Sequence, residues 1–600
     1  MTRTPSARPA ALLAALLLAT FASRLAAGLA PGGFAWGLDF ARWVPPPVAW
    51  ALFALWAGAL GLALVERGPR PAEAMDAPRP PGAAAGAAGN LSRAWPWLLG
   101  GALLALLALL PDRVRFVGDF VLRLGVLDEG WFRRLFPQAL PLDVWLNHAL
   151  PGRVATLLST EPLAVMRALG LLEAALLVTL AVRFSRVVAA GPAAAAAVAA
   201  VLAFGGYATL LTGYGKPTPQ LALCTLAAGT LGVELVRNAR AAIPFAAAVS
   251  LGLALHRGAL PLLLVWAAAA ALAWRRPGAG RARLWPLLAP ALVFAWEAPR
   301  LLHVIRSFDV GVNFLPPEVR QQGGALAAAF APLRLMDAAN AVLLHAPLAP
   351  LALLAPLRAR RSPEALFLCA LLVAFVPVLL FVYLPLGPYR DYDSLGPAGA
   401  AFAVASAWAL ARALAGARRA RGLALAAAVS VVVPFLLLLV SLTDLERGFA
   451  RAEALLEGPP RRHATHRASV LDWMGLRALN EERYDLARAS YRRLSEETPL
   501  PRAFKLWGAA ALIADAPREA GVAFERLLER VPGDPVGWYG LWLAAAAAGD
   551  SATAARASAH ALRWGSGSRE MRDVVEFFEH YPRLYGVLRG VLESGTAPGP

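Results

Sequence analysis

The stretch WPWLLGGALLALLALLPDRVRFVGDFVLRLG, residues 95–125, decides the fold of this chain. Its first half, up to Leu110, carries no charged side chain and is apolar enough to lie in lipid. Its second half is a loop of mixed charge and aromatic residues that holds an acid, Asp119. The stretch therefore predicts a membrane-crossing helix with a carboxylate just beyond its end.

The composition excludes a soluble protein of this length. The chain has 600 residues, of which 58% are hydrophobic and only 16% are charged, too few charges to cover a soluble surface. Runs rich in Ala, Leu and Val recur from end to end, and they do not alternate as the strands of a membrane barrel do. We therefore expect an all-α, polytopic helical membrane protein.

The net charge of +18 is a feature that nucleic-acid-binding proteins share. The arginines cluster between the apolar runs, so membrane topology explains them and we expect no nucleic-acid partner. Cys224 and Cys369 both lie inside apolar runs, which indicates buried packing and neither a disulfide framework nor a zinc site.

About 13 runs meet the roughly 20-residue criterion for crossing a bilayer. They lie near 10–28, 48–65, 96–111, 163–183, 187–204, 219–236, 241–255, 259–274, 285–300, 335–356, 364–385, 397–415 and 422–442. The region 241–274 is either one long tilted span or two short spans hinged at 256–258. The parity of the later loops favours two.

The arginines orient these spans. With a cytoplasmic N-terminus, every inside connection carries at least two basic residues, whereas the short outside turns at 205–218, 256–258 and 386–396 carry one each. This asymmetry follows the positive-inside rule and places everything after residue 442 outside. We expect a multi-pass protein of the bacterial inner (plasma) membrane. The first run also has features of a cleaved signal peptide, although an uncleaved helix is favoured.

The sequence divides into four regions. Residues 1–66 hold two transmembrane helices, and 67–94 form a Pro/Ala/Gly linker, so the first two spans are expected to be an appendage. Residues 95–442 form the main membrane domain, with a large first outside loop at 112–162 whose spacing predicts amphipathic surface helices. Residues 443–600 are charged and helical, and we expect them to form a separate outside domain.

Two segments of that last region superimpose at a shift of 33, with Tyr491 falling on Phe524 and Leu494 on Leu527. A weaker third copy spans 548–565. A helix–turn–helix period near 34 residues is typical of tetratricopeptide repeats, an α-solenoid that binds peptides or docks a protein partner. The alternative is an irregular domain of helical hairpins.

Several polar side chains on the expected outside face are candidates for a site. Asp119 follows Gly118, which allows a tight turn and brings the carboxylate close to a bound group. The same loop carries Glu129, Asp143 and His148. For any one of these loop residues, the alternative is a side chain that simply faces water.

Further candidates lie in three short outside turns. The segment GPYRDYDS (387–394) holds Arg390, Asp391 and Asp393, where the arginine could grip a phosphate through its planar fork. The segment GYGKPTPQ (213–220) holds Tyr214 and Lys216. His256 lies at the tip of a hairpin. The full set of these turn residues is Tyr214, Lys216, His256, Arg390, Asp391 and Asp393. The alternatives are an Arg–Asp surface pair, a snorkelling lysine and a hydrogen-bonded turn histidine.

Recognised nucleotide-binding loops, zinc sets and nucleophile elbows do not occur in the sequence. We assign no metal ligands and no cofactor, and the need for a divalent metal is left open.

Five segments carry a family resemblance: GDFVLRL with PLDVWLNHAL, FGGYATLLTGYGKPTPQLALCTL, LGLALHRGALPLLL and GPYRDYDSLGPAGAAFA. They resemble uncharacterised bacterial members of the GT-C superfamily of membrane glycosyltransferases, over roughly 95–440. The coupling to repeats is similar to that of transmembrane O-mannosyltransferases. Two positions depart from the pattern: Phe120 stands where a second acid often follows the first, and Lys216 stands where relatives tend to have an acid.

The resemblance implies a sugar donor carried on polyprenyl phosphate, membrane lipid around the site, and an extracytoplasmic acceptor. Asp119 would act as general base or orient the acceptor, and Arg390 and Lys216 would stabilise the departing phosphate. The competing hypothesis is a non-catalytic membrane scaffold with repeats. A transporter is less favoured because the polar groups gather at one face. An enzyme requires Asp119, Arg390 and Lys216 to converge on one cavity that is open both to lipid and to the outside.

Overall fold

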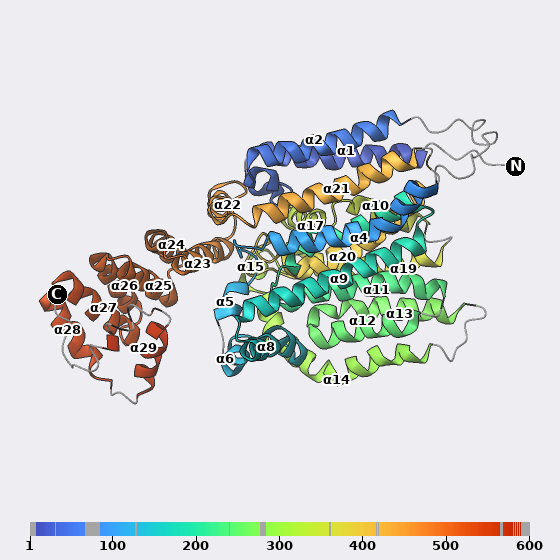
Figure 1. Cartoon of the computed structure of the whole chain (residues 1–600). Coiled ribbons are helices and arrows are strands. Elements are labelled where there is room, and N and C mark those ends of the chain that lie inside the picture. Colours follow the sequence, from blue (N-terminus) through green and yellow to red (C-terminus); the bar gives the residue numbers. More distant parts are fainter. Residues whose placement is uncertain are drawn as a thin grey trace, which may run out of the picture. The chain divides into compact units, whose positions relative to one another are not determined.

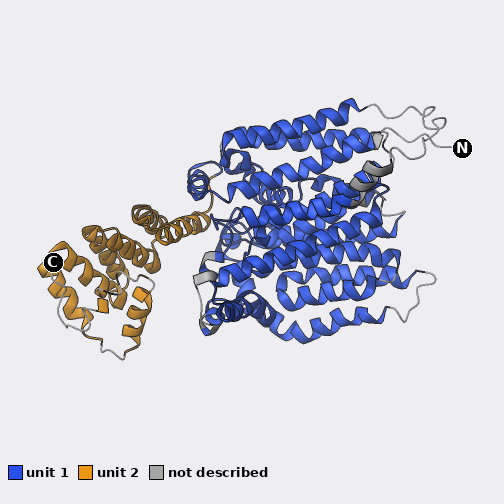
Figure 2. Ribbon diagram, in the orientation of Figure 1, with its two compact units in different colours: residues 1–460 blue, residues 461–600 orange. Residues whose placement is uncertain are grey.

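The computed structural model describes residues 8–30, 32–66, 85–125, 129–238, 241–276, 284–358, 362–415, 417, 419–564, 568–579, 581, 584, 586, 588 and 589. Across these residues the secondary structure is helical, and no strand occurs among them. The chain forms two compact units, residues 1–460 and residues 461–600 (Figure 2). The expected all-α class is thus confirmed.

Long helices make up the first unit, and most of them run side by side (Figure 1). They are α1 (Arg8–Leu29), α2 (Pro46–Val65), α4 (Ala85–Leu109), α9 (Pro162–Val188), α10 (Pro192–Ala203), α11 (Pro217–Arg237), α12 (Ala242–Leu255), α13 (Pro261–Trp274), α14 (Ala289–Val304), α17 (Pro332–His345), α19 (Pro363–Phe381), α20 (Gly396–Leu414) and α21 (Ala420–Ser441). Many begin with proline in the first turn, where the missing N–H costs no helical hydrogen bond.

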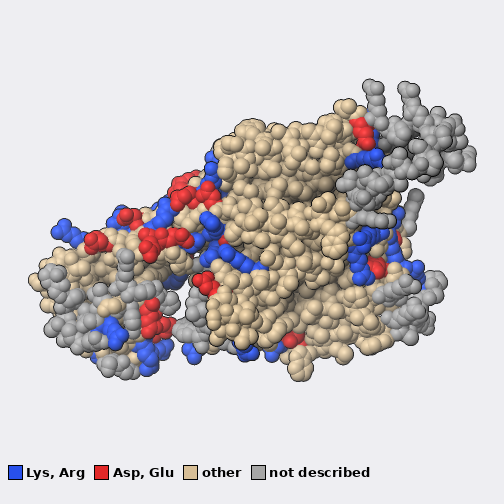
Figure 3. Space-filling model, in the orientation of Figure 1, with Lys and Arg blue, Asp and Glu red and all other residues tan. Residues whose placement is uncertain are grey.

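Nine helical stretches of the described residues are long and apolar enough to cross a membrane. Three shorter apolar helices add to them: Ala94–Leu109, Pro192–Ala203 and Ala242–Leu255. Figure 3 shows one face of the first unit, with charged side chains gathered at its two ends and other residues covering the surface between. These features are those of a multi-pass helical membrane protein, while the count of about 13 spans stays a prediction.

The expected run at 335–356 is broken in the structure. Helix α17 ends at His345, and a 3₁₀ turn (Ala349–Leu353) and the short helix α18 (Leu354–Arg358) follow. Pro347 and Pro350 explain the break, because each removes a backbone donor and clashes with the preceding helical turn. The expectation of one continuous helix across this segment was therefore wrong.

The expected outside loops are largely helical. In the first loop the helices are α5 (Phe120–Gly125), α6 (Glu129–Leu135), α7 (Pro141–Val144), a π-helical turn (Trp145–Ala149) and α8 (Leu150–Leu158). In the loop at 301–334, α14 continues as a π-helix (Ile305–Phe314), followed by α15 (Pro317–Gln321) and α16 (Ala325–Ala329). The helical spacing noted in the first loop is therefore realised in short segments.

The two N-terminal helices are part of the first unit and are not an appendage. The Trp36 indole donates a hydrogen bond to Asp337 at 2.9 Å, and the Trp56 indole donates one to Ser430 at 2.8 Å. Helices α1 and α2 pack along α21 (Figure 1). The composition of the linker at 67–94 predicted that these two helices would be independent of the main membrane domain. Buried tryptophans pack against α17 and α21 instead, so that prediction was wrong.

The boundary between the units lies after residue 460, later than the predicted 442. The intervening helix α22 (Leu445–Glu457) is amphipathic and packs onto the first unit through Phe449, Leu455 and Leu456. The Arg451 guanidinium donates to the backbone oxygen of Trp36 at 3.0 Å. The charged composition that begins at residue 443 therefore belongs at first to this amphipathic helix, which is part of the first unit.

The described residues of the second unit form seven helices; from α23 to α28 consecutive helices pack against each other, and α29 packs against α27. They are α23 (Ala464–Asn480), α24 (Tyr484–Glu497), α25 (Pro501–Ile513), α26 (Pro517–Arg530), α27 (Pro535–Ala548), α28 (Ser551–Ala561) and α29 (Arg569–Glu579). Helices α24, α26 and α28 begin at Tyr484, Pro517 and Ser551, close to the 34-residue interval of tetratricopeptide repeats.

The same contact recurs in the first two repeats of this unit. A glycine of one helix faces an aromatic ring of the next, Gly475 against Tyr491 and Gly508 against Phe524. A methyl group on Gly508 would lie 2.5 Å from the Phe524 ring. The third copy has Ala557 in place of the aromatic residue, which accounts for its weaker match.

Two helical glycines of the second unit provide a matched test of this contact. We expect Gly508→Ala to destabilise the unit by about 1–3 kcal/mol, because the added methyl overpacks the Phe524 ring. Gly521→Ala, in α26 with open space around it, should stabilise by about 0.5–1 kcal/mol through helix propensity. Thermal unfolding of the two full-length variants measures both effects, and equal melting temperatures would contradict the packing.

Candidate functional site

Three loop segments meet at one end of the first unit: 112–119, 213–218 and 387–395. The Gly118 amide donates to the backbone oxygen of Arg390 at 2.7 Å, and the Tyr214 hydroxyl donates to the Val117 oxygen. Gly118 has a φ of +61°, and a Cβ there would lie 2.5 Å from the Lys216 ammonium nitrogen. Only glycine fits at this position, beside the acid that the sequence marked.

Lys216 bridges two carboxylates at the centre of this site. Its Nζ lies 2.8 Å from Asp119 and 3.0 Å from Asp393, and its side chain is 11% exposed. Asp393 is fully buried and also accepts a hydrogen bond from the Thr218 hydroxyl at 2.9 Å. We call Asp119, Lys216 and Asp393 the ion cluster.

The charges of the ion cluster shift the pKa values of its members. Burial alone would raise the pKa of Asp119, but the cations of Lys216 and Arg123 outweigh it and lower that pKa to about 2. Burial opposes the charge on Lys216 as well, yet Asp119 and Asp393 hold its pKa above the ordinary value. Both members are therefore charged at physiological pH.

Arg390 joins the segments through backbone groups. Its guanidinium donates to the Phe116 oxygen at 3.1 Å and to the Gly118 oxygen at 2.8 Å, and the side chain is buried. Arg390 is therefore a buried residue that holds the loop carrying Asp119. Its role as a phosphate ligand stays a prediction.

Asp391 is buried next to the ion cluster. It accepts a hydrogen bond from the Leu386 amide at 2.8 Å. Burial and the negative charge of Asp393 raise the pKa of Asp391 to about 7. Asp391 therefore keeps its proton to a higher pH than an ordinary aspartate.

Arg123, a residue that sequence reasoning did not single out, extends the ion cluster. It lies one helical turn after Asp119 in α5, 3.7 Å from that carboxylate, and forms a two-pronged pair with Asp143 at 3.0 and 3.2 Å. It also donates to the Gly215 oxygen at 3.2 Å. The predicted site residue Asp143 is thus joined to Asp119 through an arginine.

From Asp143 the polar contacts continue through amides. The Asn147 amide donates to Asp143 at 3.0 Å, and Asn147 and Gln220 exchange hydrogen bonds at 2.8 and 2.9 Å. Gln220 also donates to Glu173 of α9 at 2.9 Å. Asn147, Gln220 and Glu173 were not predicted from the sequence. Each lies inside a helical segment, and spacing along the chain does not show which distant residue faces it.

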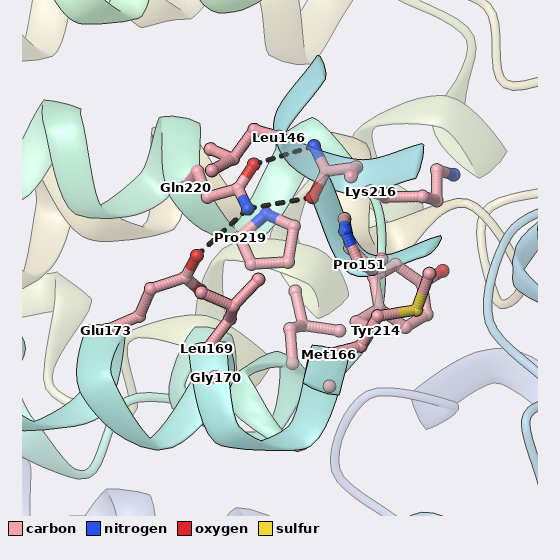
Figure 4. Close-up of a pocket in the computed structure, with 14 residues that line it drawn as sticks. Leu146, Pro151, Met166, Leu169, Gly170, Glu173, Tyr214, Lys216, Pro219 and Gln220 are labelled. Carbon is pink, nitrogen blue, oxygen red and sulfur yellow. Dashed lines mark hydrogen bonds between the residues drawn. The ribbon is translucent and has the colours of Figure 1, made fainter. Parts of the chain in front are cut away.

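A small pocket with a cavity volume of about 10 Å³, room for about one water molecule, adjoins Lys216 (Figure 4). Figure 4 shows Gln220 hydrogen-bonded to Glu173, and the Lys216 side chain lies on the opposite side of the pocket. Its polar lining is Asn147, Glu173, Tyr214, Lys216 and Gln220, and its apolar lining includes Leu146, Met166 and Leu169. Cations, amides and apolar side chains therefore face one small space.

The remaining predicted residues lie outside the ion cluster. The His256 ring accepts from the Gly258 amide, and burial and the charge of Arg257 lower the pKa of this histidine well below its ordinary value. The His148 ring stacks on Phe132 with centroids 4.3 Å apart. Glu129 begins α6, but its side chain lies outside the described residues. The structure thus brings together seven of the predicted residues. They are Asp119, Lys216, Tyr214, Arg390, Asp391, Asp393 and Asp143. The two histidines lie beside this set and are not part of it.

The described residues contain no group of three or more His, Cys, Asp or Glu side chains that could hold a metal ion. Cys224 lies in α11 and Cys369 in α19, and both are free thiols.

No protein-family model and no curated protein matches this chain. Among solved structures, a crystal structure of the Archaeoglobus fulgidus oligosaccharyltransferase with a tethered acceptor peptide is similar to it, at 16% sequence identity and a TM-score of 0.35. The match covers 66% of this chain and 59% of that chain, so the chain spans less than two thirds of that structure's length. At this TM-score, the likeness carries no argument about fold or function.

The raised pKa of Asp391 predicts a pH dependence of stability. The folded state binds this proton more tightly than the unfolded chain, whose aspartate pKa is about 3.9, so the free energy of unfolding falls as pH rises from about 4 to about 7. Asp391→Asn keeps the acceptor for Leu386 without the charge. We expect it to melt a few degrees above the wild type at pH 8, and to differ less at pH 5.

Melting curves at both pH values measure this effect in the purified protein. The exposed Glu161→Gln serves as the control and should follow the wild type. His256 titrates in both proteins, so its contribution cancels in the comparison. An Asp391→Asn protein that melts below the wild type at pH 8 would show that the ionised carboxylate stabilises the fold.

Proposed function

We propose that this chain is a membrane glycosyltransferase of the GT-C kind, which transfers a sugar from a polyprenyl-phosphate carrier to an extracytoplasmic acceptor. The observation that carries the proposal is the ion cluster beside the Lys216 pocket, built from three loops at one end of an apolar helix bundle. The sequence segments that resemble this superfamily include those same three loops. In support of it, Lys216 contacts Asp119 and Arg390 holds the loop that carries Asp119, while of these three residues Lys216 alone lines the pocket.

The chemistry proposed for the site is a displacement at the anomeric carbon. An acceptor nucleophile forms a bond to this carbon while the bond to the phosphate oxygen breaks, and the electron pair leaves with the polyprenyl phosphate. Lys216 has three N–H groups, of which two face Asp119 and Asp393, and it also lines the pocket. Its third N–H can stabilise the negative charge that grows on the leaving phosphate.

Asp119 faces the acceptor in this proposal. Its pKa of about 2 makes it a permanent anion and a weak base. It is therefore suited to orienting the acceptor by accepting a hydrogen bond, and to taking the proton late, when the new bond has largely formed. Its side chain is 22% exposed, which leaves an approach from outside.

We place the donor head group at this pocket, which has room for about one water molecule and must widen to admit a sugar. The amides of Asn147 and Gln220 and the carboxylate of Glu173 offer partners to sugar hydroxyls, and Leu146, Met166 and Leu169 offer an apolar wall toward the carrier chain. The positive-inside pattern supports a cytoplasmic N-terminus and an outside location for this end of the bundle, in a bacterial inner membrane.

For the second unit we propose a tetratricopeptide-like domain that docks a protein partner. The recurring glycine–aromatic contact and the helix interval support this reading. The same observations support the second candidate function, a scaffold without catalysis. The two candidates differ in whether Asp119 matters for chemistry.

Asp119→Asn is the direct test of catalysis. We expect it to lower the release of polyprenyl phosphate by about 100-fold or more, because the neutral amide cannot take a proton from the acceptor. The assay incubates the purified protein with a panel of polyprenyl-phosphate sugars and an envelope fraction as the acceptor source. Transfer by the wild type and the variant at equal rates would remove Asp119 from the reaction.

Asp112→Asn is the matched control in the same loop. Asp112 accepts a hydrogen bond from the Arg115 amide, which asparagine can also accept, so this variant should keep the wild-type rate. Absence of transfer by the wild type with every donor, together with intact folding, would favour the scaffold.

A further inference from the structure

Lysine is rare in this chain. Of its 58 basic residues only two are lysines, Lys216 and Lys505, and the rest are arginines. Both lysines pair with buried aspartates, Lys505 with Asp534 at 2.7 Å and Lys216 with two carboxylates at once. At Lys216 a compact ammonium fits between two oxygens where the planar fork of arginine would not.

The two carboxylates around Lys216 come from different loops and are costly to bury. Asp393 is fully buried, and its Oδ1 has no hydrogen-bond partner, while its Oδ2 faces Lys216 and Thr218. Asp119 is 22% exposed, and two carboxylates that converge in this way repel each other unless a cation lies between them. Oxygen pairs of this kind are also the ligands that Mg²⁺ and Mn²⁺ prefer.

The ammonium of Lys216 already occupies the position between these carboxylates. Its backbone is extended, as expected before Pro217, and Gly118 packs directly against its nitrogen. The Tyr214 ring lies 5.7 Å from the same nitrogen. A divalent ion therefore does not fit the ion cluster while Lys216 is in place.

We propose that Lys216 is the built-in cation of the ion cluster, a positioning residue that holds Asp119 and Asp393 together in place of a divalent metal. The wild-type site then takes no divalent ion, and removing the lysine side chain turns the two carboxylates into a Mn²⁺ site. The assignment rests on the ion cluster itself, and its bearing on catalysis rests on the proposed function.

The test measures Mn²⁺ binding by electron paramagnetic resonance and by thermal melting of the full chain, without any sugar substrate. We expect no bound Mn²⁺ at the wild-type cluster. Lys216→Ala should bind one Mn²⁺ and melt about 5 °C higher at a Mn²⁺ concentration near 100 times its Kd. The double variant Lys216→Ala/Asp393→Asn should lose both effects.

Lys505→Ala is the matched control, because it also removes a lysine paired with a buried aspartate but leaves a single carboxylate. It should gain no Mn²⁺. Ethylammonium in the buffer should partly restore the melting temperature of Lys216→Ala, a rescue that simple loss of packing would not show. Lys216→Arg should not substitute for the lysine, since its fork cannot sit between the two oxygens.

Two results would overturn the assignment. One is Mn²⁺ bound to the wild type and lost in Asp393→Asn, a measurement that stands even if Lys216→Ala fails to fold. The other is a folded Lys216→Ala that gains neither Mn²⁺ nor rescue by ethylammonium. Neither result depends on sugar transfer, so failure here is distinct from failure of the proposed function.

Discussion

Charge buried at one end of an apolar helix bundle is the constraint on which the rest of the site depends. Asp393 is fully buried, and Asp143 and Arg123 are nearly so. A buried carboxylate without a partner costs several kcal/mol, so each must face a cation or a donor. Lys216 and Arg123 supply these cations, and they thereby tie together loops that are far apart in the sequence.

The positions of the charged side chains in the ion cluster are fixed by the ends of helices. Pro217 begins α11 directly after Lys216, and α20 begins three residues after Asp393 with Gly396. The apolar helices provide rigid supports, and the short loops between them leave little freedom for the charged side chains. A site built on such supports keeps its geometry without a large loop rearrangement. Arg390 adds to this order because it grips the backbone on both sides of Val117.

The polar contacts extend beyond the ion cluster through Asn147 and Gln220 to Glu173. Amides between charged groups satisfy buried donors and acceptors without adding charge, which suits a location beside apolar helices. This arrangement links Asp119, in the first loop, with the Glu173 carboxylate on α9. It also explains why the pocket beside Lys216 has both polar and apolar walls.

The sequence by itself determined the helical membrane class, the positions of nearly all long helices and the repeat of the second unit, because hydrophobic length and periodicity are local properties. It also marked Asp119, Lys216, Asp391 and Asp393 as exceptional, since charge beside an apolar run is visible in one dimension. Only the tertiary structure decided which charges meet, that α1 and α2 pack into the body, and that Arg123, Asn147, Gln220 and Glu173 belong beside the site. Those outcomes depend on pairing between distant segments, and ion pairs and hydrogen bonds reach only a few ångströms, so spacing along the chain cannot reveal them.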